Sequence, residues 1–123
     1  SGKLQSIQQC VGPLEKVQDI FAKLQIEPSQ FVICKGWFQE TLPKARQDMG
    51  PVALLRLDGD WYESIKVCLD NLYDNVVQGG CVVIDDYDFW PGCKKAVDEF
   101  ITARKISPAL NRIDSTAVYW VKS

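Results

Sequence analysis

Two apolar segments that each end in acidic residues constrain the fold of this chain more than any other feature. Both have the length and aliphatic composition of strands buried inside a sheet. They are Val52–Leu57, followed by Asp58 and Asp60, and Cys81–Ile84, followed by Asp85 and Asp86. Between them, apolar residues recur at helical spacing: Ile65, Cys68, Leu69, Leu72 and Val76. A strand, a helix and a second strand in succession predict a parallel pair joined by a right-handed crossover.

The segments on either side continue this alternation of helices and strands. The apolar spacing predicts helices over Pro13–Leu24 and after Pro91, and strands over Phe31–Cys34 and Ala117–Val121. The intervening Gly36–Pro43 is interpreted as a compact aromatic loop or a single turn. We therefore expect an α/β fold, built as a three-layer sandwich around a mostly parallel sheet.

Composition narrows the functional classes. The chain has 123 residues, 46% hydrophobic and 24% charged, which suits one globular domain over residues 1–123, with Ser1-Gly2 resembling a cloning scar. Its 14 basic and 16 acidic residues are well mixed, which argues against a nucleic-acid or membrane-binding surface. Five cysteines and no histidine exclude a Cys/His zinc site and a His-dependent triad within this chain. Reduced thiols in a cytoplasmic protein are the expectation.

The acids at the two strand ends are expected to converge. Ligands of parallel α/β sheets collect outside the carboxyl ends of the strands, and strands joined by one helix are commonly neighbours. Several carboxylates at one place repel one another, and a hard cation such as Mg²⁺ relieves that repulsion through oxygen ligands. A plainer interpretation is also open for each acid. Asp60 would cap the following helix, with Glu63 completing a box, and Asp86 and Asp88 would form turns.

Two chemistries fit acids in this position. The pattern LLRLDGD resembles the start of haloacid-dehalogenase-type phosphatases, in which the first Asp attacks a phosphoryl group. That family places Thr or Val directly after the second Asp, whereas Trp61 stands here, which counts against it. The alternative is a metal-assisted transferase, in which the cation holds two substrate oxygens and lowers the pKa of one.

Four longer motifs favour the transferase. GWFQETLP, LLRLDGDWYES, QGGCVVIDDYDFWPGCKKAVDEF and the terminal YWVK follow one another from about Val11 to Lys122. In order and spacing they closely resemble the macrocin O-methyltransferase (TylF-type) family of S-adenosylmethionine-dependent enzymes. The resemblance implies a class I methyltransferase fold, reduced here to strands 3–7 of the family. It also implies Mg²⁺-dependent transfer of a methyl group from S-adenosylmethionine to a sugar-type hydroxyl.

The resemblance also implies roles for individual residues. The metal ligands would be Asp58, Asp85 and Asp86, with Asp58 also the base that accepts the hydroxyl proton. Gly36 and Trp37 match the loop that borders the adenine of the cofactor. Positions near the acceptor pocket are matched by Trp61, Tyr62 and Trp90, for which ordinary core or rim packing is the alternative.

One part of the family pattern is missing. The family has a glycine-rich turn for the methionine end of the cofactor, and no Gly-x-Gly occurs in this chain. We expect the chain to begin just before the family's third strand, which would leave an apolar strand at a sheet edge that invites pairing. The prediction is therefore a homodimer or a higher assembly. The alternative function is a catalytically inactive, oligomeric α/β module that binds a small molecule or a protein partner.

Overall fold

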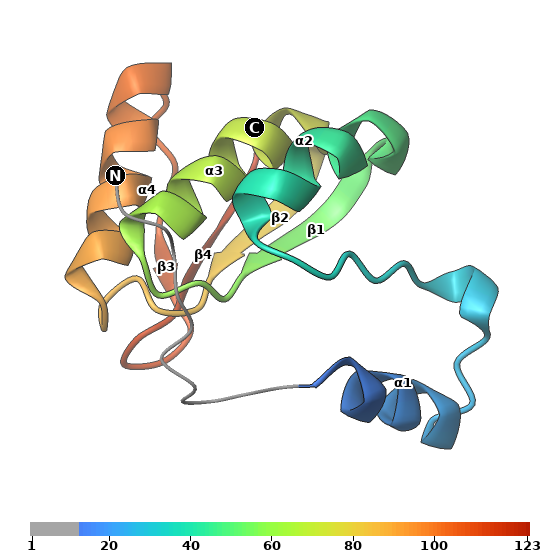
Figure 1. Cartoon of the computed structure of the whole chain (residues 1–123). Coiled ribbons are helices and arrows are strands. Elements are labelled where there is room, and N and C mark those ends of the chain that lie inside the picture. Colours follow the sequence, from blue (N-terminus) through green and yellow to red (C-terminus); the bar gives the residue numbers. More distant parts are fainter. Residues whose placement is uncertain (1–12) are drawn as a thin grey trace. The chain divides into compact units, whose positions relative to one another are not determined.

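A computed structural model of the chain describes residues 13–123 (Figure 1). Cys10 and the Ser1-Gly2 start lie outside the described residues. The chain divides into two units, Ser1–Lys35 and Gly36–Ser123, and each is treated by itself below. No helix of the described residues is both long and apolar enough to cross a membrane.

The first unit contains the helix α1 (Leu14–Lys23) and the short 3-10 helix η1 (Pro28–Gln30). Helix α1 confirms the predicted helix, and the ring of Phe21 packs against that of Phe31 at a centroid distance of 4.3 Å. The predicted strand over Phe31–Cys34 is wrong, because this segment forms neither helix nor strand. A strand requires a hydrogen-bonded neighbour, and the described part of this unit contains none.

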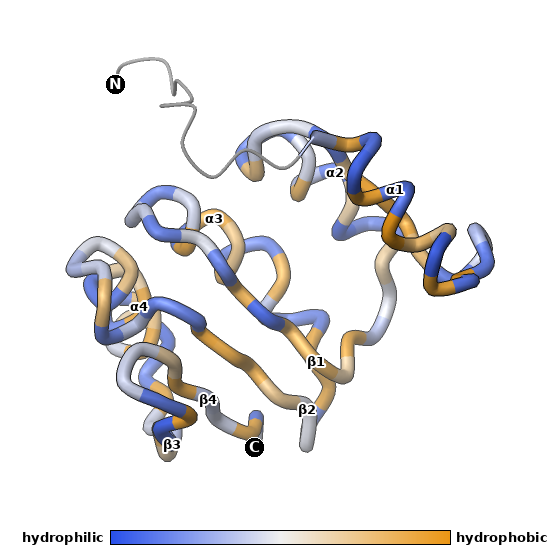
Figure 2. Tube along the Cα trace, turned by 90° about the horizontal axis from the view of Figure 1, so that it is seen from below, coloured by the Kyte–Doolittle hydropathy of each residue, from blue (hydrophilic) through white to orange (hydrophobic). Residues whose placement is uncertain are grey.

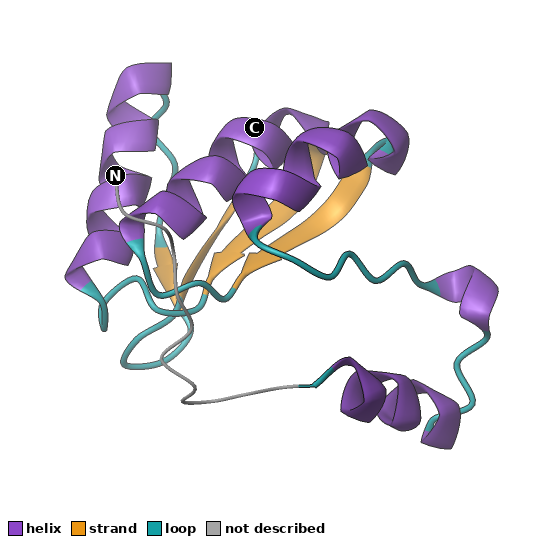
Figure 3. Cartoon of the chain, viewed as in Figure 1, coloured by secondary structure: helices purple, strands orange, loops and turns teal. Residues whose placement is uncertain are grey.

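The second unit contains a four-stranded sheet with the strand order β1-β2-β4-β3 (Figure 3). Its strands are β1 (Val52–Leu57), β2 (Val76–Ile84), β3 (Asn111–Arg112) and β4 (Val118–Val121). Its helices are α2 (Phe38–Met49), α3 (Tyr62–Leu72), the 3-10 helix η2 (Tyr73–Asn75) and α4 (Pro91–Arg104). The α/β class is thus confirmed, as are the strands predicted over Val52–Leu57, within Cys81–Ile84 and at the carboxyl terminus.

The mostly parallel sheet is a wrong prediction. Strands β1 and β2 are parallel, as their crossover helix α3 requires, but β4 runs antiparallel to both β2 and β3. The reason is a hairpin turn at Asp114, whose carboxylate accepts hydrogen bonds from the backbone N–H groups of Thr116 and Ala117. This turn sends the chain back between β2 and β3.

One face of the sheet carries the hydrophobic core. Leu55 lies beside Val82 in the register, and Val82 lies beside Trp120, so the three side chains share the buried face. Helices α2, α3 and α4 cover this face (Figure 1), with α3 packed between the other two. The opposite face of the sheet carries Leu54 and Val121, which are 59% and 55% exposed. The second unit therefore contains two of the three predicted layers.

Two local features depart from the sequence interpretation. The stretch expected to be a loop or single turn opens the twelve-residue helix α2, with Pro43 inside it. The predicted helical stripe ends at Leu72, and Val76 instead starts β2. Gly80 permits this longer strand to bulge, because a Cβ atom there would lie 2.9 Å from the Val77 oxygen and 3.1 Å from the Ala53 oxygen. Figure 2 shows the hydrophobic character along β1 and β2.

Candidate metal and acceptor site

The loops after β1 and β2 bring three carboxylates together. Asp58, Asp60 and Asp86 each offer an oxygen, and these oxygens lie within 4.8 Å of one another. The two loops meet because the parallel register continues past the strands, where the Asp85 N–H donates to the Leu57 oxygen at 2.9 Å. The two acid pairs converge, as predicted. The three carboxylates that lie closest together include Asp60 and not Asp85.

Asp60 does not cap α3, so that interpretation is wrong. The residue before the helix is Trp61, in an extended conformation, and no side chain caps the helix. The helix begins one residue later than a cap at Asp60 requires. The Asp60 side chain is consequently directed to the other carboxylates instead of to the helix backbone.

Asp85 pairs with a guanidinium instead. The Nη2 atom of Arg56 lies 2.9 Å from Oδ1 of Asp85, and its Nη1 atom lies 3.5 Å from Oδ2 of Asp58. Arg56 therefore bridges the two loops with a positive charge. The sequence analysis assigned no role to Arg56. The sequence spacing could have predicted the contact between Arg56 and Asp58, because residues two apart along an extended chain lie on the same face.

The electrostatics of the cluster show a shortage of positive charge. Burial, followed by the hydrogen bond and charge of Asp60, raises the pKa of Asp86 to about 7. Burial and the neighbouring Asp58 also raise the pKa of Asp85, although Arg56 opposes that shift. The possible metal ligands of the cluster are all carboxylate oxygens. Such ligands suit a hard divalent cation, whose positive charge would offset the repulsion between the carboxylates. The residues present therefore fit Mg²⁺.

Exposed aromatic residues lie at the ends of the two acid-bearing loops. Trp61 and Trp90 directly precede α3 and α4, and they are 42% and 41% exposed. The starts of these two helices touch, because a Cβ atom on Gly92 would lie 3.1 Å from the Tyr62 nitrogen. Phe89 packs edge-on against Trp90 with a centroid distance of 5.0 Å. Two of the three predicted acceptor residues thus have accessible rings, and the third, Tyr62, is half-buried.

The predicted cofactor residues form an open surface. Gly36 has a φ of 136°, a left-handed conformation that suits glycine, and Trp37 is 41% exposed at the start of α2. Neither residue lines the cavity between α3 and α4 or the one beside α1. Both residues are exposed, so they present an accessible surface to a ligand.

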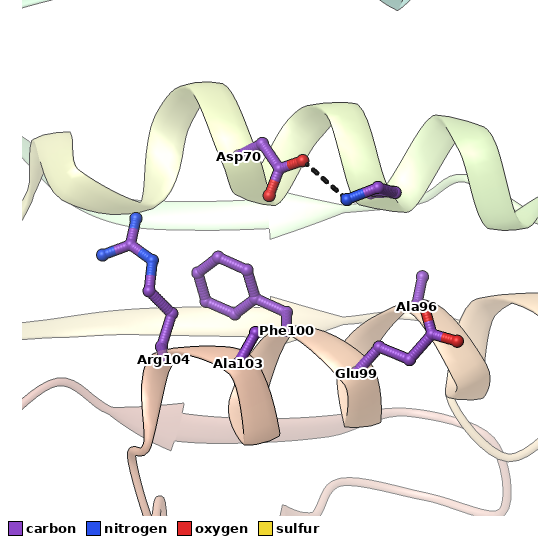
Figure 4. Close-up of a pocket in the computed structure, with 7 residues that line it drawn as sticks. Asp70, Ala96, Glu99, Phe100, Ala103 and Arg104 are labelled. Carbon is purple, nitrogen blue, oxygen red and sulfur yellow. Dashed lines mark hydrogen bonds and ion pairs between the residues drawn. The ribbon is translucent and has the colours of Figure 1, made fainter.

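A separate cavity of about 200 Å³ lies between α3 and α4 (Figure 4). Its charged lining is largely paired internally, since Lys66 lies 3.0 Å from Asp70. Arg104 also lines the cavity, and its guanidinium lies 2.8 Å from the carboxylate of Asp74 in η2. None of the four strand-end acids lines this cavity, so it is distinct from the acid cluster.

The chain is similar in sequence and in structure to known O-methyltransferases. The family model described as macrocin-O-methyltransferase (TylF) matches residues 3–122. Demethyldecarbamoylnovobiocin O-methyltransferase of Streptomyces niveus is 42% identical over 109 residues. An 8-demethyl-8-(2,3-dimethoxy-alpha-L-rhamnosyl)-tetracenomycin-C 4'-O-methyltransferase of Streptomyces olivaceus is 40% identical over 108 residues. The solved structure of the O-methyltransferase NovP superposes with a TM-score of 0.85 at 41% identity.

These matches cover most of this chain but only part of each relative. The two sequence matches span 89% and 88% of the chain, and 41% and 40% of the respective relatives. The structural match spans 89% of the chain and 45% of NovP. The chain thus corresponds to less than half the length of each of these three relatives.

Proposed function

This chain belongs to the macrocin O-methyltransferase (TylF) family, and we propose that it provides the metal- and acceptor-binding half of a Mg²⁺-dependent O-methyltransferase. The methyl donor would be S-adenosylmethionine and the acceptor a sugar-type hydroxyl. The observation that carries the proposal is the meeting of Asp58, Asp60 and Asp86 oxygens within 4.8 Å. Relatives named as O-methyltransferases of glycosylated natural products support the choice of acceptor.

The carboxylates of this cluster perform two tasks in the proposed reaction. Asp58 and Asp86 would hold the cation, with Asp60 as the third carboxylate of the cluster. Asp85, the other ligand implied by the family resemblance, is paired with Arg56 in the structure. A bound Mg²⁺ supplies positive charge that lowers the pKa of an acceptor hydroxyl. Asp58 would accept the hydroxyl proton, since its side chain is 54% exposed and accessible to an acceptor.

The aromatic rim and the cofactor positions complete the proposal. Trp61 and Trp90 offer flat, exposed rings on which the acceptor would rest, and the half-buried Tyr62 would contribute to the same pocket. Gly36 and Trp37 would border the adenine of the methyl donor from one side only, because they form an open surface. Binding of the donor therefore depends on protein surface beyond these two residues.

Assembly and location are further parts of the proposal. Within residues Gly36–Ser123, strand β1 pairs only with β2, which leaves one edge of an apolar strand to a second copy of the chain. The free thiols of Cys34, Cys68, Cys81 and Cys93 support a reducing, cytoplasmic environment.

Calorimetric titration tests the function directly. We expect Mg²⁺ or Mn²⁺ to bind the chain and to raise its melting temperature, and Asp58→Asn or Asp86→Asn to abolish both effects. The matched control is Asp48→Asn, which removes an exposed carboxylate of α2. Titration with S-adenosylmethionine, with and without metal, then tests the cofactor. Absence of metal binding at millimolar concentration would overturn the metal site, and absence of cofactor binding under both conditions would leave the chain without methyltransferase activity of its own.

A further inference from the structure

Helix α4 carries a repeated arrangement of charges that faces both acid-bearing loops. Two adjacent lysines, Lys94 and Lys95, are followed one helical turn later by two adjacent acids, Asp98 and Glu99. Residues four apart lie above one another on a helix, so Lys94 is paired in position with Asp98 and Lys95 with Glu99, and the second pair also makes an ion-pair contact. Ala96 between these pairs is 2% exposed, so the middle of this stretch is packed into the core.

The first pair holds the loop after β2. The hydroxyl of Tyr87, the residue directly after Asp86, donates to Oδ1 of Asp98 at 2.6 Å. The Nζ atom of Lys94 lies 5.1 Å from the centroid of the same ring. Tyr87 is 8% exposed, so this contact is sheltered from solvent. The loop that presents Asp86 is thereby fastened to α4.

The second pair holds the start of α3, directly after the loop that follows β1. The hydroxyl of Tyr62, two residues after Asp60, donates to Oε2 of Glu99. The Nζ atom of Lys95 lies 5.2 Å from the centroid of the Tyr62 ring and 3.9 Å from Oε1 of Glu99. Each tyrosine is therefore bound by one carboxylate and lies near one lysine of the same helix.

We infer that α4 sets the distance between the two halves of the acid cluster, with Asp98 and Glu99 as positioning residues that act through Tyr87 and Tyr62. The inference deepens the proposed metal site and rests on it. The cluster oxygens come from two loops, and a small cation tolerates little change in their separation. A single rigid helix that binds both loops reduces the number of separations that they can adopt.

The two loops differ in the number of contacts that they make outside α4. The inference therefore predicts which tyrosine matters more for metal binding. The loop after β2 is also tied to the β3–β4 hairpin, because Arg112 pairs with Asp88 and the Asp88 N–H donates to the Thr116 oxygen at 2.9 Å. Beyond the acid cluster, no second fastening of this kind is found for Asp60 among the described residues. Loss of the Tyr62 hydroxyl should therefore weaken metal binding more than loss of the Tyr87 hydroxyl.

The test measures Mn²⁺ affinity of the full chain by calorimetry and by the electron paramagnetic resonance signal of free Mn²⁺. Tyr62→Phe and Tyr87→Phe each remove one hydroxyl group, and we expect Tyr62→Phe to weaken binding about 10-fold, the low end for partners outside the ligand set. Glu99→Gln keeps an acceptor for the Tyr62 hydroxyl, so its affinity should stay within about 2-fold, whereas Glu99→Ala should match Tyr62→Phe. Tyr119→Phe, on the opposite face of the sheet, is the control.

The outcomes separate the inference from the function on which it rests. If the tyrosine variants bind Mn²⁺ as the unmodified chain does, while Asp58→Asn and Asp86→Asn do not bind it, the positioning role is overturned and the metal site stands. If the unmodified chain does not bind Mn²⁺, both are overturned. If the two tyrosines had a purely structural role, their variants would lower the metal-free melting temperature, but Tyr62→Phe would not weaken Mn²⁺ binding more than Tyr87→Phe. That result would also contradict the inference.

Discussion

The guanidinium of Arg56 lies 2.9 Å from the carboxylate of Asp85, at the point where the two acid-bearing loops meet. Arg56 projects from the sheet face opposite the core, next to Val83 in the register. It therefore reaches the acids from the uncovered side of the sheet. A positive side chain in this place compensates part of the acidic charge and also competes with any cation for it.

Replacement of Arg56 should separate these two effects. Arg56→Gln removes the charge but keeps a polar group, so we expect tighter Mg²⁺ binding by up to about five-fold, the scale of one exposed charge interaction. The metal-free melting temperature should fall, because Asp85 and Asp58 lose their partner. Calorimetry and melting curves at low ionic strength measure both. Lys66→Gln, which breaks a pair of similar exposure on α3, is the control and should leave metal affinity unchanged. Weaker binding by Arg56→Gln would show that Arg56 instead holds Asp85 in place.

Asp86 should make the metal-free protein less stable as the pH rises. Its pKa is about 7 in the folded chain, against an ordinary value of 3.8. Between these two values the folded state binds a proton that the unfolded state has lost, so this group's contribution to stability falls from about pH 4 to pH 7. Metal binding requires the ionised carboxylate and should strengthen over the same range.

Melting curves of the metal-free protein between pH 5 and pH 8 check this sign. As the pH rises, the melting temperature of Asp86→Asn should increase relative to that of the unmodified chain, because the amide carries no charge that could destabilise the folded state. The comparison with Asp48→Asn removes the general effect of one fewer acid. A pH-independent difference would contradict the raised pKa of Asp86.

The strand–helix–strand unit could be predicted from the sequence because its signals are local. The apolar run Val52–Leu57 forms β1 with those bounds, and Ile65, Cys68, Leu69 and Leu72 are the buried face of α3. The antiparallel orientation of β4 depends on where the β3–β4 hairpin joins the sheet, and the residue pattern of β4 itself does not predict this position. The segment Phe31–Cys34 has strand composition but lacks a strand partner within its described unit.

The candidate site could be predicted in its location but not in its pairing. Acids at two parallel strand ends had to meet, and they do. Which acids lie closest together depends on other parts of the structure. Asp85 binds Arg56, and Asp60 does not cap α3 because the helix begins only at Tyr62. The anchoring of Tyr62 and Tyr87 depends on the rotation of α4 about its axis, which only the packed structure determines.

The core on the covered face of the sheet should respond strongly to truncation. Ile65 of α3 is 0% exposed, and Ile65→Ala should lower the free energy of unfolding by about 2–5 kcal/mol, since the methyl groups leave a cavity. Ile113→Ala removes the same groups from a side chain that is 53% exposed, and it should change stability by less than about 0.5 kcal/mol. Urea unfolding followed by circular dichroism measures both. Equal effects would contradict the packing of α3 on the sheet.

Self-association through the edge of β1 is the remaining proposal. Within residues Gly36–Ser123, β1 pairs on one side only, and Leu54 at its centre is 59% exposed. A second copy that pairs along this edge would satisfy the backbone groups of β1 and cover Leu54, so we expect a dimer at micromolar concentration. Size-exclusion chromatography with light scattering measures the mass. Leu54→Lys should give a monomer, because two lysines would meet at the interface, whereas Ile113→Lys, on the hairpin after β3, should remain dimeric. A clean monomer of the unmodified chain would refute this arrangement, and the unpaired edge of β1 would then have to be satisfied by solvent or by other protein surface.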